Sequence, residues 1–231
     1  MNVLIGCERS GQLRRRFRQA GHDAWSCDIE DAQDGSPFHL KQDVISVLAD
    51  GWDLMICHPE CRYLSSSGMH WTTRGIRPKH LTDDAIKFAL ALWNSPILKV
   101  ALENPVGILS KRIGKPAQTI QPFEFGDDAS KRTCLWLRGL EPLVPDPRQF
   151  IRGRLVCGQC GRVVHPETGI EWEFAASHGC CKCGADAAIQ RPRWANQTDS
   201  GQNRLGPSDK RAAERARTYD GIADAMVEAW G

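Results

Sequence analysis

The chain has 231 residues, of which 41% are hydrophobic and 25% charged, a composition typical of a folded globular protein rather than a disordered one. Its 30 basic and 28 acidic residues leave a formal net charge of +2, which is too small to indicate a nucleic-acid partner. The N-terminal residues MNVLIGCERSG do not resemble a signal peptide, and no apolar run is long enough to span a membrane. We therefore expect a cytoplasmic protein without a membrane partner, built from one sizeable domain and a small insertion.

Strands and helices are predicted to alternate along the chain. The first β-α-β unit consists of a strand at 1–6, a helix at 12–21 capped by Ser10, and a strand at 22–30. The later predicted elements are a short helix within 42–48, a strand at 52–59, a helix at 81–95 capped by Thr82, a strand at 96–105, a strand at 131–140 and a helix at 218–231. This alternation predicts an α/β fold with a doubly wound sheet.

The predicted strand at 52–59 ends in the sequence WDLMICHPECRYLSSSG, which places Cys61 just beyond a proline turn. Ligands of open α/β folds bind at the carboxyl ends of the strands. Cys61 is therefore either a nucleophile at the edge of the sheet or a displaced core residue. His58, three residues earlier, could border this site, but a surface or structural role is favoured for it.

Five of the ten cysteines lie between residues 157 and 183, in two Cys-x-x-Cys-Gly motifs. In a reducing compartment such paired motifs indicate a tetrahedral zinc site rather than disulfides. The expected ligands are Cys157, Cys160, Cys180 and Cys183, with Cys181 as the alternative to Cys180 and two histidines, His165 and His178, as weaker substitutes. Four protein ligands leave no open position, so the zinc is expected to be structural and to fold a small β ribbon.

Three segments, in this order, resemble signatures of the DNA cytosine-5 methyltransferases. They are DLMICHPECRYLSSSG for the strand end that carries the family's nucleophile, ALENPVGIL for its Glu-Asn-Val segment, and SKRTCLWL for its Gln-x-Arg-x-Arg strand. The similarity spans roughly residues 1 to 140 and the last dozen. It implies a Rossmann-like methyltransferase core, DNA as substrate, and S-adenosylmethionine as methyl donor.

The resemblance also implies roles for individual residues. Cys61 is expected to add to C6 of cytosine, Glu103 to act as acid at N3, and Arg132, with Lys131 as its rival, to hold the pyrimidine O2. Because C5 is inaccessible in a duplex, the base must be flipped out or unpaired. The residues expected at the cofactor are Gly6, Glu8, Ser10, Gly11, Asp28, Asp43 and Pro59.

The sequence departs from the family at several positions. Glu60 replaces the second proline of the nucleophile motif and Arg62 its glutamine, and the family's glycine-rich loop is replaced by IGCERSG. Two alternatives therefore stay open. The same site could use a folate one-carbon donor to make 5-hydroxymethylcytosine, or the chain could be a non-catalytic DNA-binding module with a decayed site.

The family's large target-recognition domain is missing, and the cysteine-rich segment takes its place. We expect a catalytic core at 1–150, a zinc ribbon at 151–190, and at 191–231 a basic segment followed by a helix that returns to the core. The residues expected to contact DNA are Arg62, Ser65, Arg193, Asn196, Gln197 and Arg204. The compact size suggests a phage or prophage origin, which would make the host's cytoplasm the compartment.

Overall fold

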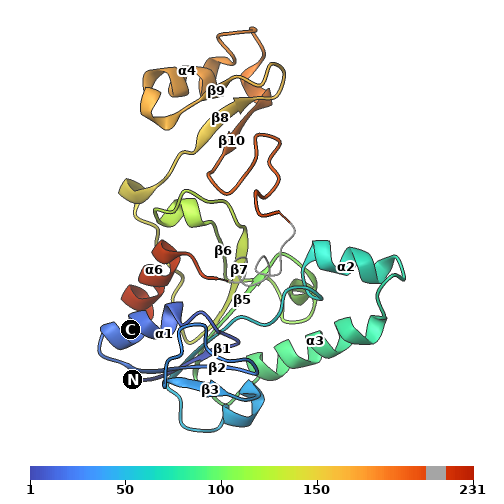
Figure 1. Cartoon of the computed structure of the whole chain (residues 1–231), viewed down its shortest axis with the longest axis vertical. Coiled ribbons are helices and arrows are strands. Elements are labelled where there is room, and N and C mark those ends of the chain that lie inside the picture. The colour runs from blue at the N-terminus through green and yellow to red at the C-terminus, as the bar shows by residue number, and fades with distance from the viewer. Residues whose placement is uncertain (207–216) are drawn as a thin grey trace. The chain divides into compact units, whose positions relative to one another are not determined.

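The computed structural model describes residues 1–206 and 217–231 (Figure 1). Contacts between Cα atoms divide the chain into two compact units. The first unit contains residues 1–120, 132–144 and the C-terminal residues from 217 on, and the second contains residues 121–131 and 145–206. These bounds differ from the divisions expected from the sequence, at residues 150 and 190.

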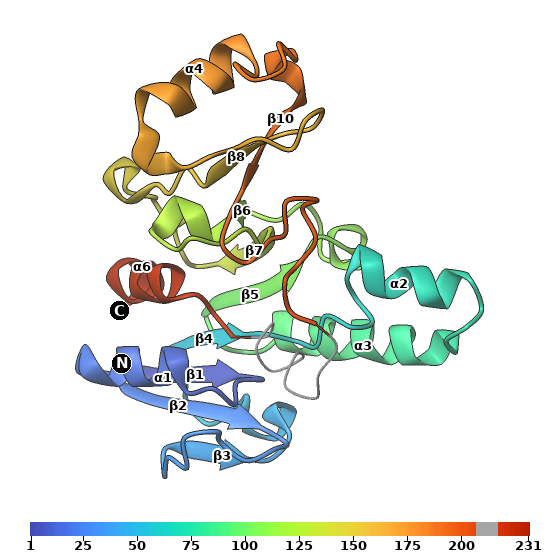
Figure 2. The same cartoon turned by 45° about the horizontal axis from the view of Figure 1, so that its top comes forward.

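The first unit is built on a seven-stranded sheet (Figure 2). Its strands lie in the order β3 (His39–Lys41), β2 (Asp23–Asp28), β1 (Asn2–Gly6), β4 (Leu54–Cys57), β5 (Lys99–Pro105), β7 (Thr133–Arg138) and β6 (Gln118–Ile120). The first five strands in this order are parallel, whereas β7 runs antiparallel to both of its neighbours. The predicted doubly wound α/β fold is confirmed.

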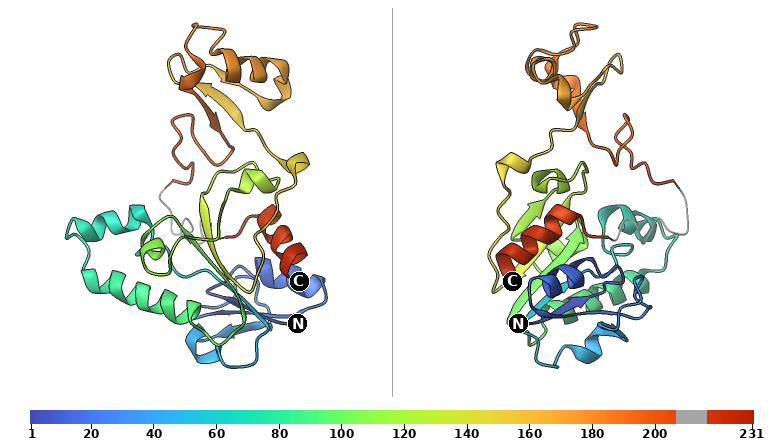
Figure 3. Two further views of the ribbon diagram at one scale, coloured as in Figure 1. Left: turned by 180° about the vertical axis from the view of Figure 1, so that it is seen from behind. Right: turned by 60° about the vertical axis from the view of Figure 1, so that its left-hand side comes forward.

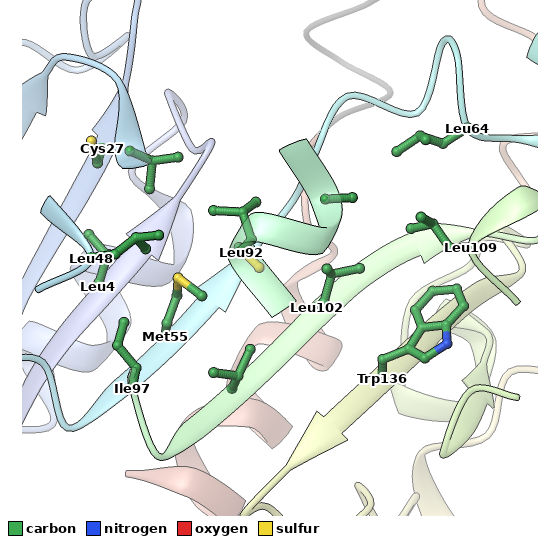
Figure 4. Packing of buried hydrophobic residues seen from close by; sticks show 14 of the residues in the cluster. Leu4, Cys27, Leu48, Met55, Leu64, Leu92, Ile97, Leu102, Leu109 and Trp136 are labelled. Atoms are coloured by element: carbon green, nitrogen blue, oxygen red, sulfur yellow. The ribbon is translucent and has the colours of Figure 1, made fainter. Parts of the chain in front are cut away.

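Each central strand is buried on both faces, which explains its nearly continuous apolar sequence. Side chains alternate between the two faces with a period of two, so Leu4, Met55 and Leu102 share one face. Helix α3 (Lys79–Trp93) covers this face and contributes Leu92 to the same cluster, as Figure 4 shows. This continuous core fixes the ends of the strands, where the candidate site lies.

Two helices that are distant in sequence pack against each other. Helix α1 (Gln12–Gln19) contacts β1 and β2 and also α6 (Asp220–Trp230), which lies beside it in Figures 1 and 3. Arg16 of α1 bonds Asp220 at 2.6 Å and Asp224 at 2.5 Å. The C-terminal helix therefore belongs to the first unit. None of the described helices is long and apolar enough to cross a lipid bilayer.

The second unit has its own small antiparallel sheet, in which β8 (Arg154–Cys157) lies between β10 (Gln190–Arg193) and β9 (Val163–Val164). Helix α4 (Ile170–His178) joins the two cysteine motifs. Trp194 is buried in this unit, where its ring stacks on Phe123 with 4.2 Å between the ring centroids. The unit therefore contains a helix and an aromatic contact beyond the predicted β ribbon.

Some local predictions were wrong. Helix α3 begins at Lys79 after Pro78, and Thr82 lies inside it, buried, with its hydroxyl 3.0 Å from that of Thr72. Helix α2 (Ser66–Thr73) was not predicted, because its sequence SSGMHWTT has no apolar periodicity. Gly11 occupies the cap position of α1, although the Ser10 hydroxyl does accept a hydrogen bond from the Gln12 amide at 3.2 Å.

Candidate active site

The strand order reverses direction between β1 and β4, and each connection leaves its strand at the same edge of the sheet. Such a switch point opens a crevice at the carboxyl ends of the strands, which is the usual ligand site of open α/β folds. The segments singled out in the sequence follow the strands at this edge: the loop with Glu8 follows β1, the turn with Cys61 follows β4, and Glu103 lies near the end of β5.

Cys61 occupies the first position of a tight turn between β4 and α2. The amides of Leu64 and Ser65 donate hydrogen bonds to its carbonyl oxygen at 3.2 and 2.9 Å. Its side chain is exposed, whereas the neighbouring Pro59 and Leu64 are buried and anchor the turn on both sides. The structure therefore presents this thiol to solvent instead of packing it into the core.

The turn that carries Cys61 is hydrogen-bonded to the segment that follows β5. The Asn104 side chain donates to the carbonyl oxygen of Pro59 at 2.7 Å, and the Ile108 amide donates to that of Leu64 at 2.9 Å. Gly107 permits this approach, because a Cβ atom there would overlap the backbone of Leu64. The strand end with Cys61 and the Glu-Asn-Pro segment are thus joined into one structure.

Glu103 is buried, with 9% of its surface exposed, and lies beside His58. Its Oε2 atom is 2.8 Å from Nδ1 of His58, a close ion-pair distance, although the oxygen lies off the direction of a straight N–H hydrogen bond. The strand register explains the contact: Cys57 of β4 faces Leu102 of β5, so the next residues along, His58 and Glu103, are also neighbours. His58 is therefore largely buried and structural, one of the roles expected for it, and not a surface residue.

Arg132 immediately precedes β7. Since β7 is antiparallel to β5 and Thr133 pairs with Pro105, Arg132 lies at the same edge of the sheet as the end of β5. Its side chain is exposed, and its positive charge acts to lower the pKa of Cys134, which burial raises overall. The cation is therefore close to this sheet edge and accessible to a ligand.

The loop after β1 is held by a buried carboxylate. Glu8 is 6% exposed, and its Oε1 atom accepts hydrogen bonds from the Leu13 amide at 2.9 Å and the Ser10 hydroxyl at 3.0 Å. Its Oε2 atom is buried and has no hydrogen-bond partner among the described residues. Gly11 has a φ of 67°, a conformation that favours glycine, and a Cβ atom at this position would overlap the Arg14 guanidinium. One carboxylate oxygen is thus left for a ligand.

Two more carboxylates influence this end of the sheet. Burial and then the charge of Asp28 raise the pKa of Cys27 to about 11. Burial also raises the pKa of Cys7, on which the charges of both Asp28 and Asp43 act in the same direction. Asp28 accepts a hydrogen bond from the Glu30 amide, and Asp43 from that of Ile45. The carboxylates of Asp28 and Asp43 therefore lie close enough to the end of β1 to act on Cys7. Gly6 ends β1 and packs on Val44.

A pocket of about 330 Å³ lies between the Cys61 turn and α3. Its wall is largely apolar, and two carboxylates, Glu60 and Asp84, lie among the lining residues. The remaining lining residues are Pro59, Tyr63, Leu64, Leu81, Ala85 and Phe88. Its volume lies within the usual range for small-molecule sites.

The second unit brings four cysteine thiols together. The Sγ atoms of Cys157, Cys160, Cys180 and Cys183 all lie within 4.8 Å of one another. A hydrogen bond from the Cys160 amide, at 3.5 Å, lowers the pKa of Cys157 to about 6. Gly161 and Gly184 end the two motifs with the same φ of 69°. This donor set suits zinc, and Cys181 is exposed and outside the cluster, which favours Cys180 in the choice left open by the sequence.

Comparisons with known proteins give matches at the level of structure. No family model and no curated protein matches the sequence. The fold is similar to that of a candidate DNA modification methyltransferase encoded within a prophage (E. coli), with a TM-score of 0.43 and 16% identity, covering 64% of this chain and 51% of that one. It is also similar to the Entamoeba histolytica methyltransferase EhMeth, with a TM-score of 0.44 and 14% identity, covering 63% of this chain and 55% of that one. The chain therefore spans about half the length of these solved structures.

The residues expected to contact DNA divide into two groups. Arg62 is exposed and 3.2 Å from Glu60, and Arg204 is exposed while its Nε donates to the Gln197 carbonyl. The others have structural contacts. The Ser65 hydroxyl caps α2, and the Asn196 side chain accepts from the backbone N–H of Ser130 and donates to its carbonyl oxygen. The Gln197 side chain accepts from the Trp194 amide, and Arg193 donates to the carbonyl oxygen of Asp199. The part of the basic segment at 207–216 lies outside the described residues.

The sequence named His58 as a possible neighbour of the site but did not reveal its contact with Glu103, and Arg77 was missed. The contact of His58 could have been found by extending the register of two adjacent strands by one residue beyond their apolar cores. Arg77 could not, since it acts from the connection after the unpredicted α2: its guanidinium donates to the carbonyls of Arg62 at 2.8 Å and Gly68 at 3.2 Å and lies over the Tyr63 ring. It holds the far side of the Cys61 turn.

Proposed function

We propose that the protein transfers a methyl group to C5 of cytosine in DNA through a covalent adduct with Cys61. The observation that carries this proposal is the joining of two strand ends. The turn with the exposed Cys61 thiol and the strand end with the buried Glu103 carboxyl are joined by the hydrogen bond from Asn104 to Pro59. A nucleophile and an acid on adjacent, mutually braced strands match the needs of addition to a pyrimidine ring.

In the proposed reaction, the Cys61 thiolate forms a bond with C6 of the cytosine. The π electrons of C5=C6 move into C4=C5, and those of C4=N3 move onto N3, which takes a proton from Glu103. C5 then uses the enamine electron pair to bond the methyl group, whose former bonding pair stays on the donor. A base removes the C5 proton, the C5=C6 bond reforms, the thiolate leaves, and the N3 proton returns to Glu103.

The exposed Arg132 is assigned to the pyrimidine O2. Its place beside the end of β5 puts a cation at the edge that carries Glu103, where charge builds up on the ring during addition. Lys131 remains the alternative to Arg132. The base reaches these groups only after it leaves the duplex stack.

The donor proposed is S-adenosylmethionine, which supplies an electrophilic methyl group on a sulfonium. Its cationic sulfur and amino group suit the carboxylates Glu8, Asp28 and Asp43, and the unpartnered Oε2 of Glu8 is available to a donor N–H group. We place the loop residues Gly6, Ser10 and Gly11 and the buried Pro59 around it. A folate donor carries an anionic tail, which these three carboxylates would not favour.

The thiol cluster of the second unit is proposed to bind a structural zinc ion. Four cysteine ligands complete a tetrahedral shell and leave no position for a substrate. We assign the unit to DNA contact through its cations, with the exposed Arg204 and the half-buried Arg193 as candidates and Asn196 and Gln197 as residues that shape the loop. In the first unit, no acidic residue occurs between Arg62 and Asp83, so this stretch suits the phosphate backbone.

Covalent trapping tests the proposal. DNA of mixed sequence in which 5-fluorocytosine replaces cytosine should form a denaturant-stable complex with the protein in the presence of S-adenosylmethionine, because fluorine at C5 blocks the final elimination. Cys61→Ser should abolish the complex, and Cys181→Ser, which alters another exposed thiol, should not. DNA binding without any complex would instead support the non-catalytic binding module.

A further inference from the structure

We propose that His58 is a positioning residue that orients the Glu103 carboxyl; this inference rests on the proposed function. His58 is nearly buried, with 12% of its side chain exposed, and Glu103 has 10%. Nδ1 of His58 and Oε2 of Glu103 are 2.8 Å apart. A buried carboxyl needs such a partner, since an unpaired buried charge is costly.

The contact involves one oxygen of Glu103. With Oε2 directed to His58, the other oxygen of Glu103, Oε1, is the one assigned to N3 of the cytosine. Nε2 of His58 is buried and has no hydrogen-bond partner among the described residues. The residues next to this pair in sequence, Cys57 and Asn104, have other roles: burial, and then the Glu103 charge, raises the pKa of the Cys57 thiol, which keeps it protonated, and the Asn104 amide nitrogen is bonded to Pro59. His58 is thus a polar group in direct contact with the Glu103 carboxyl.

The role can be written as a balanced proton movement. Before addition, the proton that will move is on Oε1 of Glu103. As the Cys61 thiolate bonds to C6, N3 takes this proton, and the contact with Nδ1 of His58 holds Oε2 of the new carboxylate in place. On elimination, the proton returns from N3 to Glu103. No redox partner is needed, and the pair ends in its starting state.

The test is a set of variants compared by the rate of covalent trapping with 5-fluorocytosine DNA and S-adenosylmethionine. His58→Leu, which removes the ring nitrogen in contact with Glu103, should lower the trapping rate by about 100-fold, within the range for a positioned acid. His58→Asn keeps a donor near the position of Nδ1 and should recover part of the rate. The affinity for DNA, measured without S-adenosylmethionine, should stay unchanged. His22→Asn, at the other edge of the sheet near the end of α1, is the matched control.

A double variant separates a positioning role from general damage to the fold. If His58 acts through Glu103, then His58→Leu combined with Glu103→Gln should trap no more slowly than Glu103→Gln alone. Additive losses, or a wild-type rate in His58→Leu, would overturn the inference while leaving the proposed function intact. Failure of the wild-type protein to trap DNA would overturn the proposed function, and this inference with it.

Discussion

Asn104 donates a hydrogen bond of 2.7 Å from its side chain to the carbonyl oxygen of Pro59, and both residues are buried. The bond joins the end of β5 to the turn that presents Cys61. The two adjacent residues therefore have different proposed roles: Glu103 protonates the base, and Asn104 holds the turn with Cys61 in place.

Asn104→Ala should therefore destabilise the protein and slow trapping at Cys61. The Pro59 carbonyl would lose its partner in a buried place, which typically costs about 1–3 kcal/mol. Urea unfolding measures the stability, and the 5-fluorocytosine complex reports on the nucleophile. Asn94→Ala, at the exposed end of α3, is the matched control and should change neither. Unaltered stability in Asn104→Ala would contradict the bracing role.

Gly68→Ala should disrupt the Cys61 turn from its other side. A Cβ atom at this position would overlap the carbonyl oxygen of Arg62, so the turn or α2 must shift. We expect a loss of about 3 kcal/mol, as for a severe overpacking, together with slower trapping. Gly75 lies in open space with a φ of 71°, so Gly75→Ala should cost only about 1 kcal/mol from backbone strain. Equal effects at the two positions would show that the close approach does not matter.

Metal analysis of the purified protein should find one zinc ion per chain. Cys160→Ser should lose the zinc, and its second unit should become sensitive to proteolysis, because the metal supplies folding energy to a unit with a small core. Cys181→Ser changes an exposed thiol one residue from a proposed ligand and should keep the metal. Zinc loss in Cys181→Ser, with retention in Cys180→Ser, would reverse the ligand assignment.

Asp34→Asn should weaken the loop that follows β1. Asp34 forms ion pairs with the buried Arg14 and with Arg15, the latter at 2.8 Å. Burial opposes ionisation of Asp34, but these hydrogen bonds prevail and hold its pKa below 3.8. Its carboxylate thus contributes stability above pH 3.8, which is lost as the pH falls through the lowered pKa. We expect a cost of about 2–3 kcal/mol at pH 7, somewhat below that of a fully buried pair.

This difference between wild type and Asp34→Asn should shrink below pH 3.8, where the wild-type carboxyl itself becomes protonated. Urea unfolding at pH 7 and at low pH measures both quantities. Asp31→Asn is the control, since Asp31 is 78% exposed in its pair with Lys41. A difference independent of pH would show that the ion pair is not the cause.

The sequence predicted the sheet because apolar periodicity marks buried strands, and the order of β1, β4 and β5 then places Cys61 and Glu103 at one edge. It could not predict α2, whose position depends on the Ser65 cap, on Gly68 and on Arg77 rather than on an apolar face. Nor could it show that Asn196 is bonded to Ser130, because this contact joins residues that are 66 positions apart. Long-range polar contacts leave no periodic signal.

The most direct measurement is mass spectrometry of nucleosides from DNA incubated with the protein, with S-adenosylmethionine in one reaction and methylenetetrahydrofolate in another. We predict 5-methylcytosine in the first reaction only, and none with Cys61→Ala. Hydroxymethylcytosine in the second reaction would keep the site but replace the donor. Unmodified cytosine in both reactions, from protein that still binds DNA, would contradict the proposed function.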